Sequence, residues 1–277
     1  MRRYTTSLVD TTMTELARYL NQTFEGYVIP FKFTATSAAN LFLQDGISLS
    51  ASRLVFEGDR FIGLGLMSRR GQASRMAALA ITPQARGQGL GKYLVDVLVQ
   101  AAKDRGERAM WLEVISQNTA AVKLYEGAGF EKQRKLIGFS VSKPAVKDVG
   151  DVTLERVNPL EVARNIINHM PLDYPWQLSG ESLIHVSAEH QAWRCGPSAA
   201  IISNPEQDTI IIRGLITDHA EQRRGYATQL LRTLFAQFPN KTWKVSIIVP
   251  ETLAGLFHKV GMTDETLSQL QMMKVLV

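Results

Sequence analysis

The sequence predicts an α/β protein of two tandem modules, each a mixed, mostly antiparallel central sheet flanked by helices. In both halves, segments with alternating or continuous apolar residues lie between segments with helical periodicity. The order strand, basic glycine turn, helix also occurs twice, and the corresponding glycines are separated by nearly constant distances. A length of 277 residues allows two domains that each bury a core.

The first half begins with helical segments and continues with a strand meander. We expect a helix that ends near Leu20, a loop over 24–33, and a second helix that ends near Asp45 and Gly46. Turns with Gly, Asp and Arg separate three predicted strands, over 52–59, 60–68 and 74–82. The remaining predicted elements are a helix over 91–106, a buried strand over 110–115, a short helix over 119–129 and a last pair of strands over 129–141.

The second half repeats this order after a polar segment. Residues 142–151 carry Pro144 and Gly150 and lack periodicity, so we place a linker there, between a module over 1–141 and a module over 152–277. The predicted repeat elements are a strand over 209–217, a glycine turn over 222–227, a helix over 228–238, a strand over 242–249 and a short helix over 252–262. Gly225 follows Gly89 by 136 residues, whereas Gly261 and Trp243 follow Gly129 and Trp111 by 132. This pattern predicts a duplicated domain.

The composition excludes several classes of protein. No apolar run approaches the roughly 18 residues of a membrane span, and the first twenty residues lack the apolar core of an export signal. The single Cys195 excludes an internal disulfide and fits a reducing cytoplasm, where we expect the protein. A net charge of +5 suggests an anionic ligand, but the cations are scattered, so nucleic acid is not indicated. The five histidines lack metal-ligand spacing, so we expect no metal, and the sequence indicates no oligomeric state.

The stretch ITPQARGQGLGKYLVDVL, from Ile81 to Leu98, contains the principal candidate binding site. Three glycines alternate with other residues directly before an amphipathic helix, whose free N–H groups and dipole favour an anion. Arg86 and Lys92 add positive charge, so the turn predicts a diphosphate ligand. Neither a Walker loop nor a dinucleotide fingerprint fits the spacing, and a glycine-rich loop without a ligand is the alternative.

Two motifs carry a resemblance to a known family. Arg86, Gly89 and Gly91 resemble the R/QxxGxG/A pyrophosphate loop of the GNAT acetyltransferase superfamily. The segment LEVISQNTAAVKLYEGAGF, residues 112–130, is similar to the signature LxVxxxNxxAxxLYxxxGF at every fixed position. The resemblance implies a tandem GNAT protein that uses acetyl-CoA as co-substrate. A primary amine of a small molecule or peptide would attack the thioester directly.

The resemblance also implies roles for individual residues. Main-chain groups of Leu79, Ala80 and Ile81 would hold the thioester, and Asn118 would contact the pantetheine arm. The pyrophosphate would lie on the loop formed by Arg86, Gly87, Gln88, Gly89, Leu90, Gly91 and Lys92. Tyr125 would be the acid for the departing thiolate, since a phenol stays protonated at neutral pH.

Glu113 is the candidate base. Strand alternation places it with Trp111 and Ile115 on one sheet face, and apolar neighbours would raise the pKa of its carboxyl group. A water relay is the alternative. Within the loop over 24–33 we expect Phe24, Glu25 and Tyr27 to line the acceptor pocket, although the aromatic side chains fit an ordinary core equally well.

The second half keeps Gln222, Gly225 and Ala227 of the loop motif but not the reactive residues. An offset of 132 places Phe257 at the position of Tyr125, Val245 at Glu113 and Pro250 at Asn118. We therefore expect a degenerate module that keeps the fold, and with it a CoA-shaped pocket without turnover. Two alternatives stay open for the whole chain. One is a non-catalytic acyl-CoA sensor or partner-binding module, and the other is a protein N-terminal acetyltransferase, suggested by the pairing of LEV with Tyr125.

Overall fold

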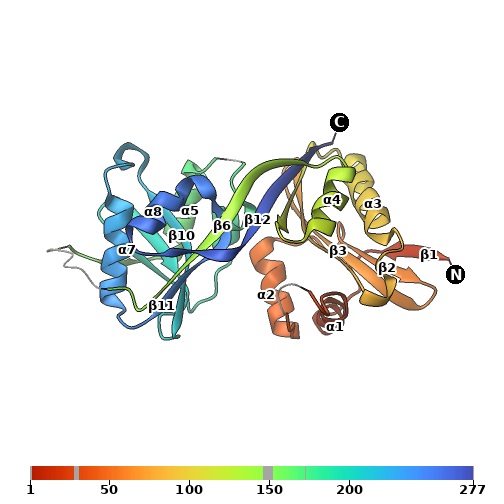
Figure 1. The fold of residues 1–277 in the computed structure, drawn as a ribbon, viewed down its shortest axis with the longest axis horizontal. Helices are drawn as coiled ribbons and strands as arrows, with labels where there is room; N and C mark the ends of the chain where they lie inside the picture. Colours follow the sequence, from red (N-terminus) through yellow and green to blue (C-terminus); the bar gives the residue numbers. More distant parts are fainter. Residues whose placement is uncertain (1, 28–30, 146–151, 172, 277) are drawn as a thin grey trace. The chain divides into compact units, whose positions relative to one another are not determined.

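The computed structural model describes residues 2–27, 31–145, 152–171 and 173–276, and the chain divides into two compact units (Figure 1). The first unit comprises Met1–Gln133 and Leu270–Val277, and the second comprises Arg134–Gln269. This division corrects the predicted boundaries at 141 and 152, because strand pairing rather than chain order decides which residues pack together. Residues 146–151 of the predicted linker lie outside the described residues.

The first unit is a sheet with helices on both faces. Its elements are β1 (Arg3–Thr6), α1 (Met13–Thr23), α2 (Ala35–Asp45), β2 (Arg53–Glu57), β3 (Arg60–Arg70), β4 (Ala73–Ile81), the 3₁₀ turn η1 (Pro83–Ala85), α3 (Leu90–Asp104), β5 (Ala109–Ile115) and α4 (Thr119–Gly127). The strand order is β1-β2-β3-β4-β5-β12, in which β12 (Thr263–Val275) contributes its residues from Leu270 onward. The pairs β1–β2, β2–β3 and β3–β4 are antiparallel, whereas the pair β4–β5 is parallel.

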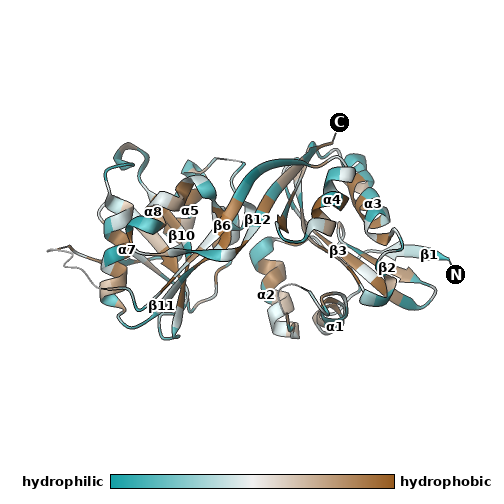
Figure 2. Ribbon diagram, in the orientation of Figure 1, coloured by the Kyte–Doolittle hydropathy of each residue, from teal (hydrophilic) through white to brown (hydrophobic). Residues whose placement is uncertain are grey.

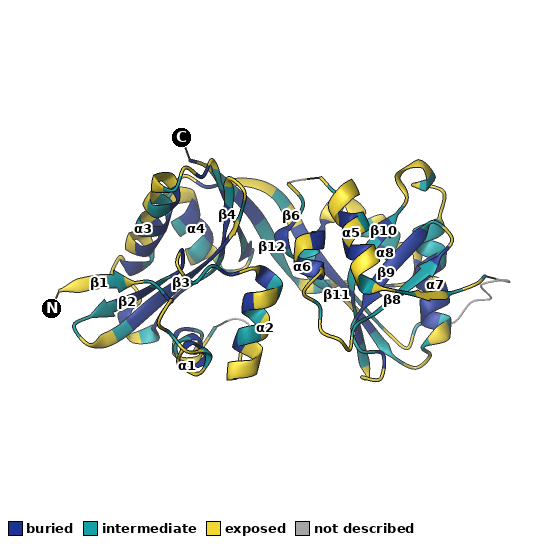
Figure 3. Ribbon diagram, turned by 180° about the vertical axis from the view of Figure 1, so that it is seen from behind, coloured by how far each residue is buried: buried dark blue, intermediate teal, exposed yellow. Residues whose placement is uncertain are grey.

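Two separate hydrophobic clusters cover the two faces of this sheet. Leu94 and Leu98 of α3 and Tyr125 of α4 belong to the cluster on one face, whereas Leu16 of α1 and Phe42 of α2 belong to the cluster on the other (Figure 1). In Figure 2 the strands β2 and β3 carry many hydrophobic residues, and the helices carry both kinds. In Figure 3 the strands of the sheet are largely buried, whereas each helix has both buried and exposed residues. The amphipathic pattern of the helices therefore sets which side contacts the sheet.

Side-chain caps fix the ends of α1 and α2. Thr12 accepts a hydrogen bond from the N–H of Glu15, and the Glu15 carboxylate accepts one from the N–H of Thr12, which completes a capping box. Thr34 begins α2 in the same way with Ser37, and Gly46 ends it in the left-handed conformation (φ 63°). α2 ends at the predicted residues, whereas α1 continues to Thr23, past the predicted end near Leu20.

β4 and β5 separate towards their carboxyl ends. Their pairing runs from Ala73 with Ala109 to Met76 with Leu112, and no further pair joins the two strands within these fully described elements. A bulge at Ala77 interrupts the pairing of β4 with β3 at the same level. The edge of β4 that faces β5 is therefore without a strand partner over residues 77–81.

The second unit repeats this architecture. Its elements are β6 (Glu131–Ser142), β7 (Glu155–Val157), α5 (Pro159–His169), η2 (Trp176–Leu178), α6 (Gly180–Leu183), β8 (Gln191–Cys195), β9 (Ser198–Ile202), β10 (Thr209–Thr217), η3 (His219–Glu221), α7 (Tyr226–Gln237), β11 (Thr242–Pro250), η4 (Glu251–Leu253) and α8 (Ala254–Lys259). The strand order is β12-β6-β11-β10-β9-β8-β7. The parallel pairing of β10 and β11 stops after Ile211 with Lys244, and a bulge lies at Arg213.

The structure confirms the predicted fold class and most of the predicted elements. The predicted pair of strands over 129–141 is wrong, because the segment is the single strand β6, which pairs with β11 of the second unit. The two strand pairs also correct the repeat offset. The pairing of β4 with β5 begins at Ala73 with Ala109, and that of β10 with β11 begins at Thr209 with Thr242. Residues of β11 therefore follow the matching residues of β5 by 133. Trp243 thus corresponds to the fully buried Met110 and not to Trp111.

Candidate functional site

The start of α3 presents free main-chain donors. The N–H of Tyr93 donates the first hydrogen bond of the helix, to the carbonyl of Gly89 (3.1 Å), so the N–H groups of Leu90, Gly91 and Lys92 lack an intrahelical partner. Gly87 and Gly89 have φ of 76° and 75°, and a Cβ atom at either would meet no atom within 4 Å. The turn is therefore open towards an anion, as its sequence predicts.

The two predicted cations of this turn also have partners within the protein. The Arg86 guanidinium donates to the carbonyls of Ile81 (3.1 Å), Thr23 (3.0 Å) and Glu25 (3.1 Å), and so ties the turn to the end of α1. Lys92 forms an exposed ion pair with Asp96 (2.7 Å). Amide groups, the helix dipole and positive charge are thus present together at this turn. Gln88 donates to the carbonyl of Gln84 (3.3 Å) and closes the turn.

The opening between β4 and β5 lies directly before this turn in the chain. Leu79, Ala80 and Ile81 pair with β3 on one side only, through Gly65, Leu64 and Gly63. Asn118 ends the loop after β5 and caps α4, because its Oδ1 accepts a hydrogen bond from the N–H of Ala121 (3.2 Å). The opening and the turn together fit an extended chain that carries a diphosphate at one end.

Tyr125 lies inside the first unit. It is 7% exposed and belongs to the same cluster as Ile81 and Val114, which come from the two strands that separate. Burial raises the pKa of its hydroxyl group above the usual value, and the nearby Tyr27 raises it further. The phenol is therefore a hydrogen-bond donor at every physiological pH.

Glu113 has a charged environment, which corrects the prediction of apolar neighbours. Its carboxylate pairs with the Nε of Arg75 (2.6 Å), and Arg75 also pairs with Asp45 at the end of α2 (3.0 Å). The Gln271 side chain from β12 donates to the other Glu113 oxygen (3.4 Å). All three charged side chains are at most 8% exposed. Burial alone would lower the pKa of Arg75, but the Glu113 and Asp45 carboxylates outweigh it and hold that pKa above the usual value.

The three predicted acceptor residues do not lie in one site: Phe24 and Tyr27 are in contact with each other, whereas Glu25 lines a separate groove. Phe24 packs against Tyr27 (ring centroids 5.2 Å apart) and Phe31 (5.4 Å) in an aromatic cluster, and Tyr27 is the residue of the three that the structure brings near Tyr125. Residues 28–30 of this loop lie outside the described residues.

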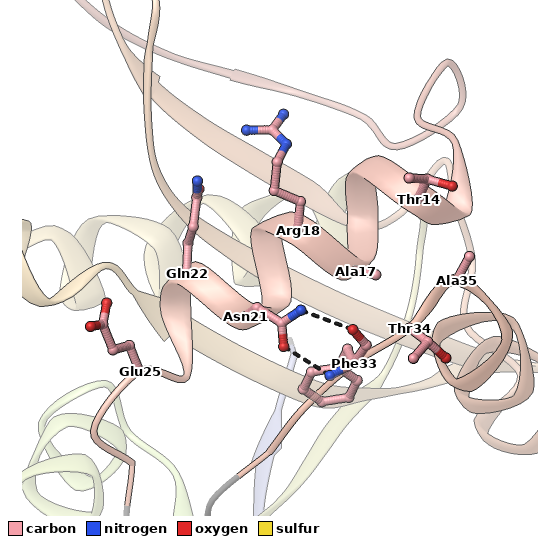
Figure 4. Close-up of a pocket in the computed structure, with 9 residues that line it drawn as sticks. All are labelled: Thr14, Ala17, Arg18, Asn21, Gln22, Glu25, Phe33, Thr34 and Ala35. Carbon is pink, nitrogen blue, oxygen red and sulfur yellow. Dashed lines mark hydrogen bonds between the residues drawn. The ribbon is translucent and has the colours of Figure 1, made fainter.

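Glu25 lines an open groove of about 530 Å³ between α1 and the start of α2 (Figure 4). Asn21 closes one wall of this groove, because its side chain both donates to and accepts from the main chain of Phe33 (2.9 and 2.8 Å). Figure 4 shows Arg18 and Gln22 extending from α1 away from that contact. The groove is thus built mainly from the polar side of α1 and not from the cluster around Tyr125.

The second unit contains a cavity of about 760 Å³. It lies at the place that corresponds to the opening between β4 and β5 of the first unit. Its walls come from β10 and β11 beyond their last pair, from the turn before α7, from the first residues of α7 and from α8. Gln222 donates to the carbonyl of Thr217 (3.3 Å), as Arg86 does to Ile81 in the first unit. The N–H of Gln229 donates to Gly225 (3.0 Å), so the N–H groups of Tyr226, Ala227 and Thr228 lack intrahelical partners.

Sequence reasoning missed the buried cluster of Arg75, Asp45 and Glu113. Arg75 within an apolar strand was the available signal, since a buried arginine requires a carboxylate partner.

Among the described residues, no helix is long and apolar enough to cross a bilayer, and no group of three or more His, Cys, Asp or Glu side chains is arranged to hold a metal ion.

Comparison with known proteins agrees with the architecture. The family model of the acetyltransferase (GNAT) family matches residues 15–130, which is nearly the whole N-terminal part of the first unit. The crystal structure of a GCN5-related N-acetyltransferase from Sphaerobacter thermophilus is similar over 99% of this chain and 96% of that one, with a TM-score of 0.73 and 15% identity. A tandem GNAT protein from the clavulanic acid biosynthesis pathway matches over 100% and 99% of the two chains, with a TM-score of 0.66 and 11% identity. The family model therefore covers residues 15–130, and the likeness to these two structures shows that the whole chain has the fold of tandem GNAT units.

Curated relatives match a part of the chain. The [ribosomal protein bS18]-alanine N-acetyltransferase of Escherichia coli strain K12 is 34% identical over 91 residues, which cover 27% of this chain and 59% of that protein. The N-alpha-acetyltransferase 30 of Schizosaccharomyces pombe is 34% identical over 90 residues, or 31% of this chain and 60% of that protein. The chain therefore spans about three fifths of the length of these relatives.

Proposed function

We propose that the first unit transfers the acetyl group of acetyl-CoA to a primary amine of a small molecule or peptide. The observation that carries this proposal is the opening between β4 and β5, which leads from the free N–H groups of α3 to the cluster that contains Tyr125. The glycines of the turn leave room for the diphosphate, and the unpaired edge of β4 fits the extended, amide-containing arm.

Transfer requires the amine nitrogen to attack the thioester carbonyl carbon, so that a C–N bond forms as the C–S bond breaks. Tyr125 would face the sulfur, where negative charge develops. Because the pKa of its phenol is raised and that of a thiol is lower, near 8.5, Tyr125 stabilises the thiolate chiefly as a hydrogen-bond donor. Main-chain groups of Leu79, Ala80 and Ile81 would hold the thioester in position for attack.

The attacking amine must also lose a proton. Both Glu113 oxygens already have partners, Arg75 (2.6 Å) and Gln271 (3.4 Å), so the geometry around Glu113 favours the water relay for this step. Glu113 then acts as a structural partner of Arg75.

A Glu113→Gln variant distinguishes the structural role of Glu113 from a role as the base. We expect the pH dependence of kcat/KM to keep its acid limb in this variant, whereas loss of that limb would identify Glu113 as the base.

An N-terminal peptide amine is the second candidate acceptor. It is favoured by the names of two curated relatives, which specify a ribosomal-protein alanine and N-alpha acetylation, and by the resemblance that the pairing of LEV with Tyr125 carries. The two acceptor classes are compared directly by measuring thiol release from acetyl-CoA with a panel of small amines and of peptides that differ in their first residue.

The Tyr125→Phe variant tests the proposed site. It keeps the buried ring and removes the donor, so we expect kcat to fall roughly 100-fold or more with little change in stability. Tyr93→Phe is the matched control, because Tyr93 lies on α3 with its side chain 38% exposed. Equal rates for wild type and Tyr125→Phe, with any acceptor found, would contradict the assignment.

A further inference from the structure

The last turn of α4 receives a cation from a strand far along the chain. The Nζ of Lys274, on β12, donates to the carbonyl of Ala128, the residue that caps α4 (2.6 Å). Within this fully described helix the last turn holds no basic residue of its own. A cation at a helix C-terminus satisfies a free carbonyl and is stabilised by the helix dipole, so Lys274 supplies what α4 lacks.

β12 holds Lys274 closely against this turn. Met272 and Leu276, which alternate with it along the strand, are 0% and 6% exposed and belong to the cluster that contains Tyr125. A Cβ atom at Gly129 would lie 2.6 Å from the Lys274 Nζ, so the ammonium group occupies room that glycine leaves. Lys274 is therefore half-buried and packed into the turn between two anchored neighbours.

The turn that Lys274 contacts also sets the position of Tyr125. The carbonyl of Tyr125 accepts hydrogen bonds from the N–H groups of Ala128 (3.1 Å) and Phe130 (3.0 Å). The ring of Phe130 packs edge-on against the Tyr125 ring, with the two centroids 6.0 Å apart. A shift of the turn therefore moves both the main chain and the ring contact of Tyr125, the residue proposed to face the sulfur.

The second unit closes the matching turn in another way. Arg232 of α7 donates to the carbonyl of Lys259 at the end of α8 (3.0 Å), and a Cβ atom at Gly261 would meet no described atom within 4 Å. The helix offset of 136 places Asp96 at the position of Arg232, and this carboxylate pairs with Lys92 and cannot donate. The first unit therefore takes from β12 a cation that the second unit takes from its own helix α7.

We propose that Lys274 is a positioning residue for acetyl transfer in the first unit. Its hydrogen bond to the turn after α4 would hold the Tyr125 hydroxyl group where negative charge develops on the sulfur. Lys274 would act through Tyr125 and not on the thioester or the amine, so the inference rests on the proposed function of that tyrosine. The reaction of the N-terminal module then depends on a side chain from the last strand of the chain.

The test is a double-mutant cycle of Lys274→Met and Tyr125→Phe, measured in the full chain by thiol release from acetyl-CoA. The acceptor is the member of the panel of small amines and peptides that gives the fastest release. Methionine keeps a long apolar stem beside Gly129 and removes the donor. We expect kcat to fall roughly tenfold with an unchanged KM for acetyl-CoA, because the tyrosine is displaced and the glycine turn is untouched. In the Tyr125→Phe background the same substitution should change kcat by less than about twofold.

Arg232→Met is the matched control. It removes the cation from the corresponding turn of the second unit, where Phe257 accepts the hydrogen bond of Met262 (3.1 Å) as Tyr125 accepts that of Phe130. Both methionine variants should lower Tm and speed the hydrogen exchange of that N–H group in their own unit, because each loosens a helix end. We expect a lower kcat in Lys274→Met alone.

A folding defect would lower kcat by the same factor in both backgrounds of the cycle. Equal losses with and without the Tyr125 hydroxyl group, or an equal loss in Arg232→Met, would therefore overturn the positioning role. An unchanged kcat in Lys274→Met would also overturn it, and thiol release by the wild type would then leave the proposed function intact. Absence of thiol release with every member of the panel would instead overturn the proposed function, and the inference with it.

Discussion

Replacing Arg75 by methionine should destabilise the first unit strongly. Methionine has a similar length and no charge, so it fills much of the space and leaves the Asp45 and Glu113 carboxylates without their guanidinium partner. Both carboxylates are almost inaccessible to water, at 8% and 3% exposure. Removing one partner of a buried ion pair typically costs about 3–5 kcal/mol, because an uncompensated charge stays buried.

The expected change is large enough to measure by thermal unfolding. For a unit of this size, 3–5 kcal/mol corresponds to a lower Tm by on the order of 10 °C. Arg69→Met is the matched control, because Arg69 is 38% exposed and its buried partner Glu107 keeps an ion pair with Arg105 (2.8 Å), so no carboxylate loses its last arginine. Glu113→Gln should also be mild, since it leaves Arg75 paired with Asp45.

The pH dependence identifies the cause. Without Arg75, the buried negative charge is removed only when the two carboxylates take up protons, and this uptake costs less free energy at low pH. The difference in Tm between wild type and Arg75→Met should therefore be smaller at pH 5 than at pH 8. A difference that is small at both pH values, or equal at both, would refute the assignment of a buried, uncompensated charge.

Two further predictions concern remote parts of the chain. Truncation after Gln269 removes the buried Gln271, Met272 and Leu276 from the first unit, so limited proteolysis should cut that unit much faster, and unchanged cleavage would contradict the role of β12. Burial, with help from Arg213, lowers the pKa of His190, so the folded state binds fewer protons than the unfolded state and loses stability as the pH falls below about 6.5. His190→Gln should flatten the Tm profile between pH 7 and 5, and parallel profiles would count against this reading.

The helices and most strands could be predicted because their signals are local. The capping box of Thr12 and Glu15, the left-handed Gly46 and the glycine turn before α3 each depend on residues within one turn of the chain. The same locality explains why motifs located the glycine turn before α3 and the position of Tyr125 within α4.

The domain boundaries could not be predicted because they depend on pairing between distant strands. Ser142 at the end of β6 pairs with Thr242, and the last residues of β12 return to the first unit, where the N–H of Leu276 donates to the carbonyl of Arg108 (2.9 Å). An apolar strand pattern specifies a buried face but not the neighbouring strand. The partner of Glu113 was hidden for the same reason, since Arg75 lies 38 residues earlier on another strand.

The corrected strand offset changes what the second unit has lost. At an offset of 133, Ser246 and not Val245 stands at the position of Glu113. At the offset of 136 between β4 and β10, Ile211, the last residue of β10 that pairs with β11, stands at the position of Arg75. The acid, the arginine and the buried carboxylate are therefore absent together from matching positions, whereas the bulge, the left-handed turn and the free amides of the helix are kept. Features that form the fold persist without any ligand or reaction, so their retention beside the loss of the reactive groups fits a unit that keeps the fold without turnover.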